Sequence, residues 1–293
     1  MGPAAADEVL PLEAASSEIG SAAGSGTRPL KAAALLYHDV VEPGRPEASG
    51  FRGAGPDRYK LDRSDFDDHV RTLAEQVRHP PAAAPELEGE GSGSTLPWLL
   101  TFDDGGASAR LIGETLAERG WRGHFFVTTD FIGTDGFVTA DDIRALESAG
   151  HVIGSHSCSH PHRMAACSWT QLLEEWQRST VALGEIVGHR VSVASVPGGE
   201  YSGTVARAAS AAQIEHLFTS EPVLAVKQVE GCRVWGRLSI VRGDPPERAA
   251  QLALGKIGPR GRMFASWQAK KAVKTIGGER YLRLRRFVLE RRR

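Results

Sequence analysis

Two adjacent carboxylates, Asp103 and Asp104, stand in the segment Thr101-Phe102-Asp103-Asp104-Gly105-Gly106, directly after a short apolar run. Parallel α/β enzymes place functional side chains at the carboxyl ends of their strands. Because neighbours on an extended chain point in different directions, one carboxylate can bind a metal ion while the other stays free as a base. A polar turn with an Asp cap on the following helix is the alternative interpretation.

A second polar segment, Ser155-His156-Ser157-Cys158-Ser159-His160-Pro161, also follows an apolar run, HVIG. Histidines four residues apart in one turn can converge on a single ion, although such a pair can equally belong to the surface or the core. This pair lies one β/α unit after HFFVTT, so we expect it at the same rim as the aspartates. Asp104, His156 and His160 would then form a two-histidine, one-carboxylate site with open positions for water and substrate.

The elements that must position these segments alternate along the chain. Apolar runs predict strands, and amphipathic or capped stretches predict helices, Thr139 being one such cap. The predicted strands lie within 31–40, 97–102, 124–129, 151–156, 191–195, 216–220 and 233–241, and the predicted helices at 64–77, 107–119, 139–149, 168–187, 203–213 and 247–254. About seven β/α units of this kind fit an α/β barrel better than an open sheet.

The motif TFDDG followed by H-S-x-x-H-P resembles the polysaccharide deacetylase superfamily (NodB homology, carbohydrate esterase family 4), over roughly residues 31–242. The resemblance implies an α/β fold with a deformed, incompletely closed (β/α)7-type barrel. It also implies a divalent metal ion, most often Zn²⁺, and hydrolysis of an N-acetyl or related amide. Carried onto this sequence, it makes Asp103 the general base and Asp104, His156 and His160 the metal ligands.

The third motif of the family is represented by residues 195–202, SVPGGEYS. We predict that Pro197, Gly198, Gly199 and Tyr201 bind substrate, because glycines let the backbone approach a ligand closely. A backbone N–H of this loop could also form the oxyanion hole, and a simple Pro-Gly turn is the alternative interpretation.

Many family members begin this third motif with an arginine that orients the catalytic aspartate. Here residues 194–196 are Ala-Ser-Val, so that role is unfilled, and Arg163 and Arg237 are the candidates to take it.

The general acid must come from an unusual place, because no histidine follows His216. The first strand ends Tyr37-His38-Asp39-Val40, which resembles a YHxV-type branch related to the poly-N-acetylglucosamine deacetylases. In that branch the barrel order is circularly permuted and the first-strand histidine supplies the acid. We therefore predict His38 as the acid and keep His216 in reserve; a histidine merely hydrogen-bonded at a strand end is the alternative.

Other polar and aromatic residues are given structural roles. We expect His124 and His162 to be structural or surface residues and Trp267 to be a packing residue, whereas Trp235, on a late strand, has the better chance of reaching the site.

Composition limits the class of protein. The 293 residues are 41% hydrophobic and 24% charged with net charge −1, which excludes a uniformly basic nucleic-acid binder. No run of about 18 apolar residues and no secretory signal is visible. The three cysteines, Cys158, Cys167 and Cys232, are an odd and scattered set that argues against a disulfide framework. These features predict a cytoplasmic protein.

The chain divides into three predicted regions: a disordered leader at 1–29, a catalytic domain at 30–255 and a basic extension at 256–293. The extension holds 13 Lys and Arg against Glu279 and Glu290, a net charge of +11. Its interleaved Leu, Phe and Val would permit docking on an anionic membrane or a partner, and a solvated helix face is the alternative.

These observations predict a metal-dependent hydrolase that removes an N-acetyl group from an amino-sugar substrate. The lack of an export signal favours a nucleotide-linked, lipid-linked or small natural-product substrate. Two alternatives remain: hydrolysis of another non-peptide C–N bond, as in a cyclic imide or ureide, and a catalytically silent carbohydrate-binding member of the family.

Overall fold

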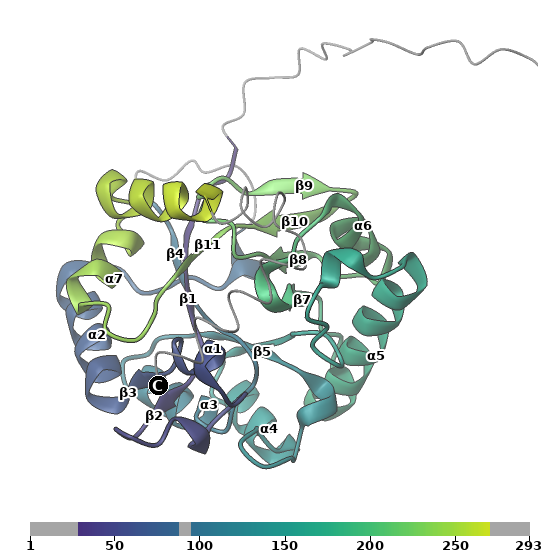
Figure 1. Ribbon diagram of the computed structural model, residues 1–293, viewed down its shortest axis with the longest axis horizontal. Helices are drawn as coiled ribbons and strands as arrows, with labels where there is room; N and C mark the ends of the chain where they lie inside the picture. The colour runs from purple at the N-terminus through teal and green to yellow at the C-terminus, as the bar shows by residue number, and fades with distance from the viewer. Residues whose placement is uncertain (1–28, 88–94, 270–293) are drawn as a thin grey trace, which may run out of the picture.

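A mostly parallel sheet forms the centre of the computed structural model, which describes residues 29–87 and 95–269 (Figure 1). Its strands are β1 (Ala33–Tyr37), β4 (Trp98–Phe102), β5 (His124–Val127), β6 (Val152–Ser155), β7 (Val193–Ser195), β8 (His216–Phe218), β9 (Lys227–Val229), β10 (Cys232–Trp235) and β11 (Arg237–Ser239). They are ordered β11-β1-β4-β5-β6-β7-β8-β10-β9, and within the described residues β9 alone runs antiparallel to its neighbour. A separate parallel pair joins β2 (Val40–Val41) to β3 (Leu61–Asp62).

The two ends of the strand order are connected through one bent segment. β10 and β11 are separated by Gly236 alone, and β10 pairs with β8 while β11 pairs with β1. A β-carbon at Gly236 would lie 2.4 Å from the carbonyl oxygen of Val223 and 2.5 Å from that of Glu221, so glycine is needed where these backbones meet. The ring is therefore completed by a bend rather than by another ladder of hydrogen bonds, which confirms the predicted incompletely closed (β/α)7-type barrel.

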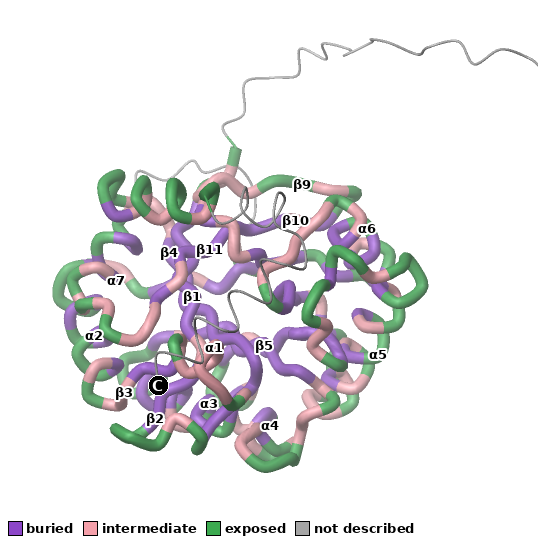
Figure 2. The backbone as a smooth tube through the Cα atoms, in the orientation of Figure 1, coloured by how far each residue is buried: buried purple, intermediate pink, exposed green. Residues whose placement is uncertain are grey.

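Helices cover the outside of this barrel, as Figures 1 and 2 show, with exposure increasing toward their outer faces. They are α2 (Arg63–Gln76), α3 (Ala109–Ala117), α4 (Ala140–Ser148), α5 (Trp169–Val187), α6 (Gly203–Ala211) and α7 (Pro246–Ala253), with the short α1 (Ala54–Asp57) near the rim. Thr139 and Ser168 close capping boxes at the starts of α4 and α5, which explains why these helices begin where they do.

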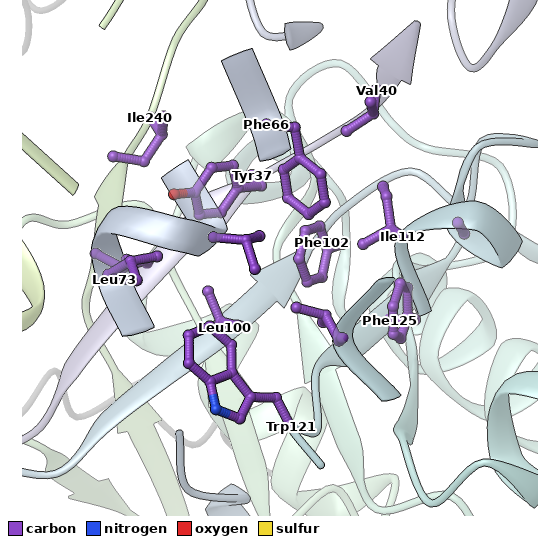
Figure 3. Close-up of a cluster of buried hydrophobic side chains, with 14 of the residues drawn as sticks. Tyr37, Val40, Phe66, Leu73, Leu100, Phe102, Ile112, Trp121, Phe125 and Ile240 are labelled. Atoms are coloured by element: carbon purple, nitrogen blue, oxygen red, sulfur yellow. The ribbon is translucent and has the colours of Figure 1, made fainter. Parts of the chain in front are cut away.

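Apolar side chains alternate between two layers because successive strand residues face opposite sides of the sheet. In the outer layer Tyr37, Phe102 and Phe125 stack in series, with ring centroids 5.6 and 5.0 Å apart, beneath the surrounding helices (Figure 3). The inner layer includes Phe126 of β5 and Trp235 of β10. Trp235 stacks there on the rings of His216 and Phe218, as a packing residue does, which counts against the expectation that it reaches the site.

The predicted elements are present with small shifts, and the short elements α1 and β3 were not predicted. The strand expected at 233–241 is broken by Gly236, the short strand β9 was not predicted, and residues 257–269 form a helix inside the predicted basic extension. Met263 of that helix packs against the outer layer. Residues 1–28 of the predicted leader and 270–293 of the extension lie outside the described residues. Within those described, no helix combines the length and hydropathy needed to cross a membrane.

Candidate active site

The predicted site residues meet where the strands end. Asp103 and Asp104 follow β4, His156 and His160 follow β6, and Ser195 is the last residue of β7. Asp104 and His160 hold left-handed backbone conformations, with φ of 77° and 57°. Non-glycine residues adopt such conformations at an energetic cost, and they concentrate where a side chain must be aimed at a particular point.

Asp104, His156 and His160 present one ligand atom each, and these atoms lie within 4.8 Å of one another. Oδ1 of Asp104 is 3.4 Å from Nε2 of His156 and 3.6 Å from Nε2 of His160. Ligands placed about 2.1 Å from one tetrahedral ion would be separated by about 3.4 Å, so these three donors fit a metal ion such as zinc.

Ser195 fixes the orientation of the His156 ring. Nδ1 of His156 lies 2.6 Å from Oγ of Ser195, and this hydroxyl donates in turn to Oδ1 of Asp103 at 3.0 Å. Because the hydroxyl proton is committed to Asp103, the hydroxyl oxygen accepts the Nδ1 proton of His156. Nε2 is then left with a lone pair directed toward Asp104, as expected of a metal-binding histidine held by a second partner.

Asp103 is held by a bidentate ion pair with Arg237, the first residue of β11. The two nitrogen–oxygen distances are 2.6 and 2.8 Å, and both side chains are buried. Burial alone would raise the pKa of Asp103, but the adjacent charge of Arg237 holds that pKa well below its usual range. Arg237 also donates through Nε to the carbonyl of Thr219 at 2.9 Å, so its guanidinium has one fixed position.

Of the two arginines considered for orienting the aspartate, Arg237 is thus the one in contact. Arg163 lies on the surface, 3.5 Å from Glu200. The missing motif arginine is replaced in space by a residue from a different strand, while Ser195 occupies the third-motif region and links Asp103 to His156.

Glu175 of α5 was not anticipated from the sequence. Its Oε2 accepts from the backbone N–H groups of Cys158 and Ser159, both at 2.9 Å, and its Oε1 accepts from the Ser159 hydroxyl at 2.6 Å. These bonds hold the loop between His156 and His160. A usable sequence signal existed, because Glu175 lies on a helix between the buried residues Leu172 and Trp176 and so borders the packed face of α5.

Asp39 ties the surrounding loops together. Its buried Oδ1 accepts from the hydroxyls of Ser49 at 2.6 Å and Ser108 at 2.9 Å, and Ser108 Oγ also accepts from the N–H of Val40. Burial raises the pKa of Asp39. This network joins the end of β1 to the start of α3, immediately beyond the Asp103–Asp104 segment.

The two acid candidates lie in different places. His38 directly follows β1, with its ring centroid 4.7 Å from that of Tyr59, and its Nδ1 is buried without a hydrogen-bond partner in the described part of the chain. His216 begins β8, at the amino end of the strand, and lies against Trp235. Because burial lowers the pKa of His216 to about 4 and its strand runs from it toward the rim, the geometry favours His38.

The predicted substrate loop borders a cavity of about 610 Å³, lined there by Gly198, Gly199 and Tyr201. Both glycines have positive φ, and a β-carbon at Gly199 would lie 2.1 Å from Oγ of Ser220. The loop therefore needs glycine for its shape and for its approach to Ser220. Pro197 is buried and does not line the cavity.

A comparison with models of known protein families finds a match to this sequence. The family model described as polysaccharide deacetylase matches residues 91–217, the span that holds both aspartates and both histidines. This match and the shared fold described below support a deacetylase that hydrolyses N-acetyl groups. A search of curated proteins found no match.

Solved structures share the fold. The deacetylase PplD of Streptococcus pyogenes, in complex with acetate, superposes with a TM-score of 0.63 at 17% identity over 77% of this chain and 99% of that one. The polysaccharide deacetylase BC0361 of Bacillus cereus gives 0.65 at 16% identity, over 77% and 69%. IcaB of Ammonifex degensii gives 0.59 at 20% identity, over 77% and 97%.

Proposed function

We propose that the protein is a metal-dependent N-deacetylase that releases acetate from an N-acetylated amino sugar. The observation that carries this proposal is the convergence of Asp104, His156 and His160 on one point, beside an aspartate held by Arg237. A metal-binding triad next to a separate, ionised carboxylate is the arrangement that hydrolysis of an unactivated amide requires.

The three donors suit a divalent cation, and we propose Zn²⁺ because one carboxylate oxygen and two imidazole nitrogens match its preferences. When bound, the cation would polarise the acetamide carbonyl and lower the pKa of water toward about 7. Asp104, His156 and His160 would hold it, with Ser195 keeping the His156 ring in place.

Asp103 is proposed to accept the proton of the attacking water. Its depressed pKa keeps it ionised at neutral pH, so it is always available as a base. The bidentate contact with Arg237 fixes the plane of the carboxylate, and the Ser195 hydroxyl holds Oδ1. A positioned base of this kind contributes roughly 10²–10⁴-fold in rate.

His38 is proposed to protonate the leaving amine. An amine is a poor leaving group, so its nitrogen must gain a proton as the C–N bond breaks. The position of His38 at the end of β1 and its contact with Tyr59, which lines the cavity, support this role. The loop containing Gly198, Gly199 and Tyr201 is proposed to bind the sugar and to offer a backbone N–H to the oxyanion.

Acetate release from N-acetylglucosamine oligomers tests the proposal, with the full chain supplied with Zn²⁺. His38→Ala should lower turnover of the amide by about 10² or more but affect an activated acetate ester much less, since that leaving group needs no proton. Turnover of a cyclic imide or ureide in place of every N-acetyl sugar would contradict the proposal, as would metal binding without turnover of any amide.

We also propose that the basic extension at 256–293 contacts an anionic membrane surface. Its described part carries exposed Ile257 and Phe264, 78% and 39% accessible, next to basic residues. Each basic residue near an anionic surface contributes about 1 kcal/mol, so binding should weaken with salt. Co-sedimentation with phosphatidylserine-containing liposomes at low and high salt tests this, and absence of sedimentation at low salt would contradict it.

A further inference from the structure

The cavity beside the substrate loop has a second wall from outside the matched family region. Besides Gly198, Gly199 and Tyr201, it is lined by Met263, Ser266 and Trp267 of the helix at 257–269. The family model ends at residue 217. Trp267, expected from the sequence to be a packing residue, is therefore a half-exposed aromatic wall of a rim cavity.

One residue that lines the cavity, Tyr59, is in contact with the proposed acid. Its ring centroid lies 4.7 Å from that of His38. A substrate whose scissile nitrogen is near His38 would therefore extend past Tyr59 into this space. The part of the substrate found there would be the part beyond the N-acetyl group.

Within the described residues, the acidic side chains that line the cavity all have ion-pair partners, whereas some of the basic side chains do not. Its carboxylates each have a cation: Glu200 lies 3.5 Å from Arg163, Glu221 lies 3.7 Å from Lys227, and Asp244 lies 3.4 Å from Arg248. Two further cations, Arg58 and Arg262, line the same cavity and make no ion pair within residues 29–87 and 95–269. These two guanidiniums leave the cavity with positive charge available to a ligand.

The chemistry of these groups identifies a ligand class. Guanidinium groups bind phosphoryl oxygens through paired, charge-assisted hydrogen bonds, and they do so at solvent-accessible sites. The aromatic faces of Tyr59, Tyr201 and Trp267 offer apolar contact to a sugar ring or to a group joined to it.

We propose that this cavity is a subsite for a phosphoryl group carried by the amino-sugar substrate, bound by Arg58 and Arg262. The inference rests on the proposed deacetylase function for the identity of the sugar. A nucleoside-diphosphate sugar and a lipid-diphosphate sugar share the chemistry that the subsite recognises. A neutral polysaccharide does not.

Binding calorimetry on the full chain tests the subsite without relying on turnover. The probes are N-acetylglucosamine 1-phosphate and the neutral methyl N-acetylglucosaminide. The phosphorylated probe should bind at least about tenfold more tightly, and Arg58→Ala and Arg262→Ala should each remove about tenfold of that preference. Arg262→Lys should restore part of it, because the charge returns without the paired donors.

Arg260→Ala is the matched control, because Arg260 lies on the same helix but does not line the cavity. It should leave both affinities unchanged, and thermal melting should show all variants folded. Equal binding of the two probes by the unaltered protein would overturn the subsite. So would an equal loss of phosphate preference in Arg260→Ala and Arg262→Ala.

Two outcomes would distinguish a failure of the subsite proposal from a failure of the proposed deacetylase function. Arg262-dependent binding without acetate release from any N-acetyl sugar would support the subsite and contradict the deacetylase. Acetate release from the neutral glycoside, with no gain from a phosphoryl group, would do the reverse. Initial rates with uridine-diphosphate-linked and farnesyl-diphosphate-linked N-acetylglucosamine then identify the source: preference for either over the neutral glycoside supports the subsite, and preference for neither overturns it.

Discussion

Buried histidines at two places in the barrel differ in the partners they keep. Below the rim, His124 accepts the N–H of Ala84 and donates to the carbonyl of Leu100, and His151 accepts the N–H of Gly123 and contacts the carbonyl of Gly113. At the rim, His156 and His160 face the carboxylate of Asp104. The first pair is satisfied by backbone, whereas the second converges on a charge.

Burial does not separate these two groups. It lowers the pKa of His124 and of His160 alike, in both cases to about 4, and the neighbouring His156 contributes further at His160. What distinguishes the proposed ligands is that their nitrogens share a carboxylate at ligand spacing. The comparison teaches that the identity of a histidine's partners, rather than its burial, indicates its role.

Replacing one histidine from each place should have the largest effects and should affect different properties of the protein. His160→Gln should lower acetate release by about 10³-fold or more with little change in melting temperature, because carbonyl polarisation and water activation are lost together. His151→Gln should lower the melting temperature and leave the activity of the folded fraction nearly intact, since two backbone contacts are disturbed. The reverse pattern, with activity lost in His151→Gln and stability lost in His160→Gln, would contradict these roles.

Asp103→Asn should keep the metal but lower turnover by roughly 10²–10⁴-fold, because the amide cannot accept the proton of water. Arg237→Lys should also lower turnover while leaving the metal in place, since one ammonium cannot hold both carboxylate oxygens. Metal content and initial rates measure both effects. Loss of metal and activity together in Asp103→Asn would make Asp103 a ligand instead.

Because burial favours the neutral form of His124, the folded protein should lose stability at acidic pH. Its folded pKa of about 4 lies below the ordinary value of 6.5, so stability is fully present above about pH 6.5 and falls as pH drops toward 4. The loss attributable to this one group is on the order of 3 kcal/mol. Urea unfolding of metal-free protein across this range should show a shallower pH dependence in His124→Gln. Parallel curves for both proteins would contradict this role.

Glu175→Gln should have the smallest effect, a loss of roughly tenfold in metal affinity, because an amide cannot accept all three hydrogen bonds that hold the histidine loop. Added metal should restore activity. Glu174→Gln is the matched control, as Glu174 is exposed and its ion pair is with Arg178. An equal effect of the two substitutions would remove Glu175 as a positioning residue.

The parts of this site that the sequence could predict are those encoded locally. The Asp103–Asp104 segment and the pair His156 and His160 each follow an apolar strand, and parallel strands bring such segments to one rim. The contact of Arg237 with Asp103 spans 134 residues and depends on the bend at Gly236, which no periodicity reveals. Glu175 could be placed on a helix, but its contact with the loop depended on how α5 packs.

The fold, like the site, could be predicted where it is encoded locally and not where it depends on contacts distant in the sequence. Alternating apolar runs and caps such as Thr139 located nearly every strand and helix of the barrel. The split between β10 and β11 was missed because Arg233–Val241 reads as one apolar-rich strand, and only the approach of the Glu221–Val223 backbone makes Gly236 a bend. The helix at 257–269 was not delimited, although a solvated helix face was one interpretation of the extension, because Gly258, Pro259 and Gly261 interrupt any helical pattern at its start.

Zinc titration of chelator-treated protein, followed by calorimetry, tests the central claim most directly. The unaltered chain should bind one ion, and His156→Ala and Asp104→Ala should each lose most of that binding, because only three protein donors converge there among the described residues. His162→Ala, an exposed histidine two residues beyond His160, should bind like the unaltered chain. Full zinc occupancy in His156→Ala and Asp104→Ala would contradict the assignment of the site.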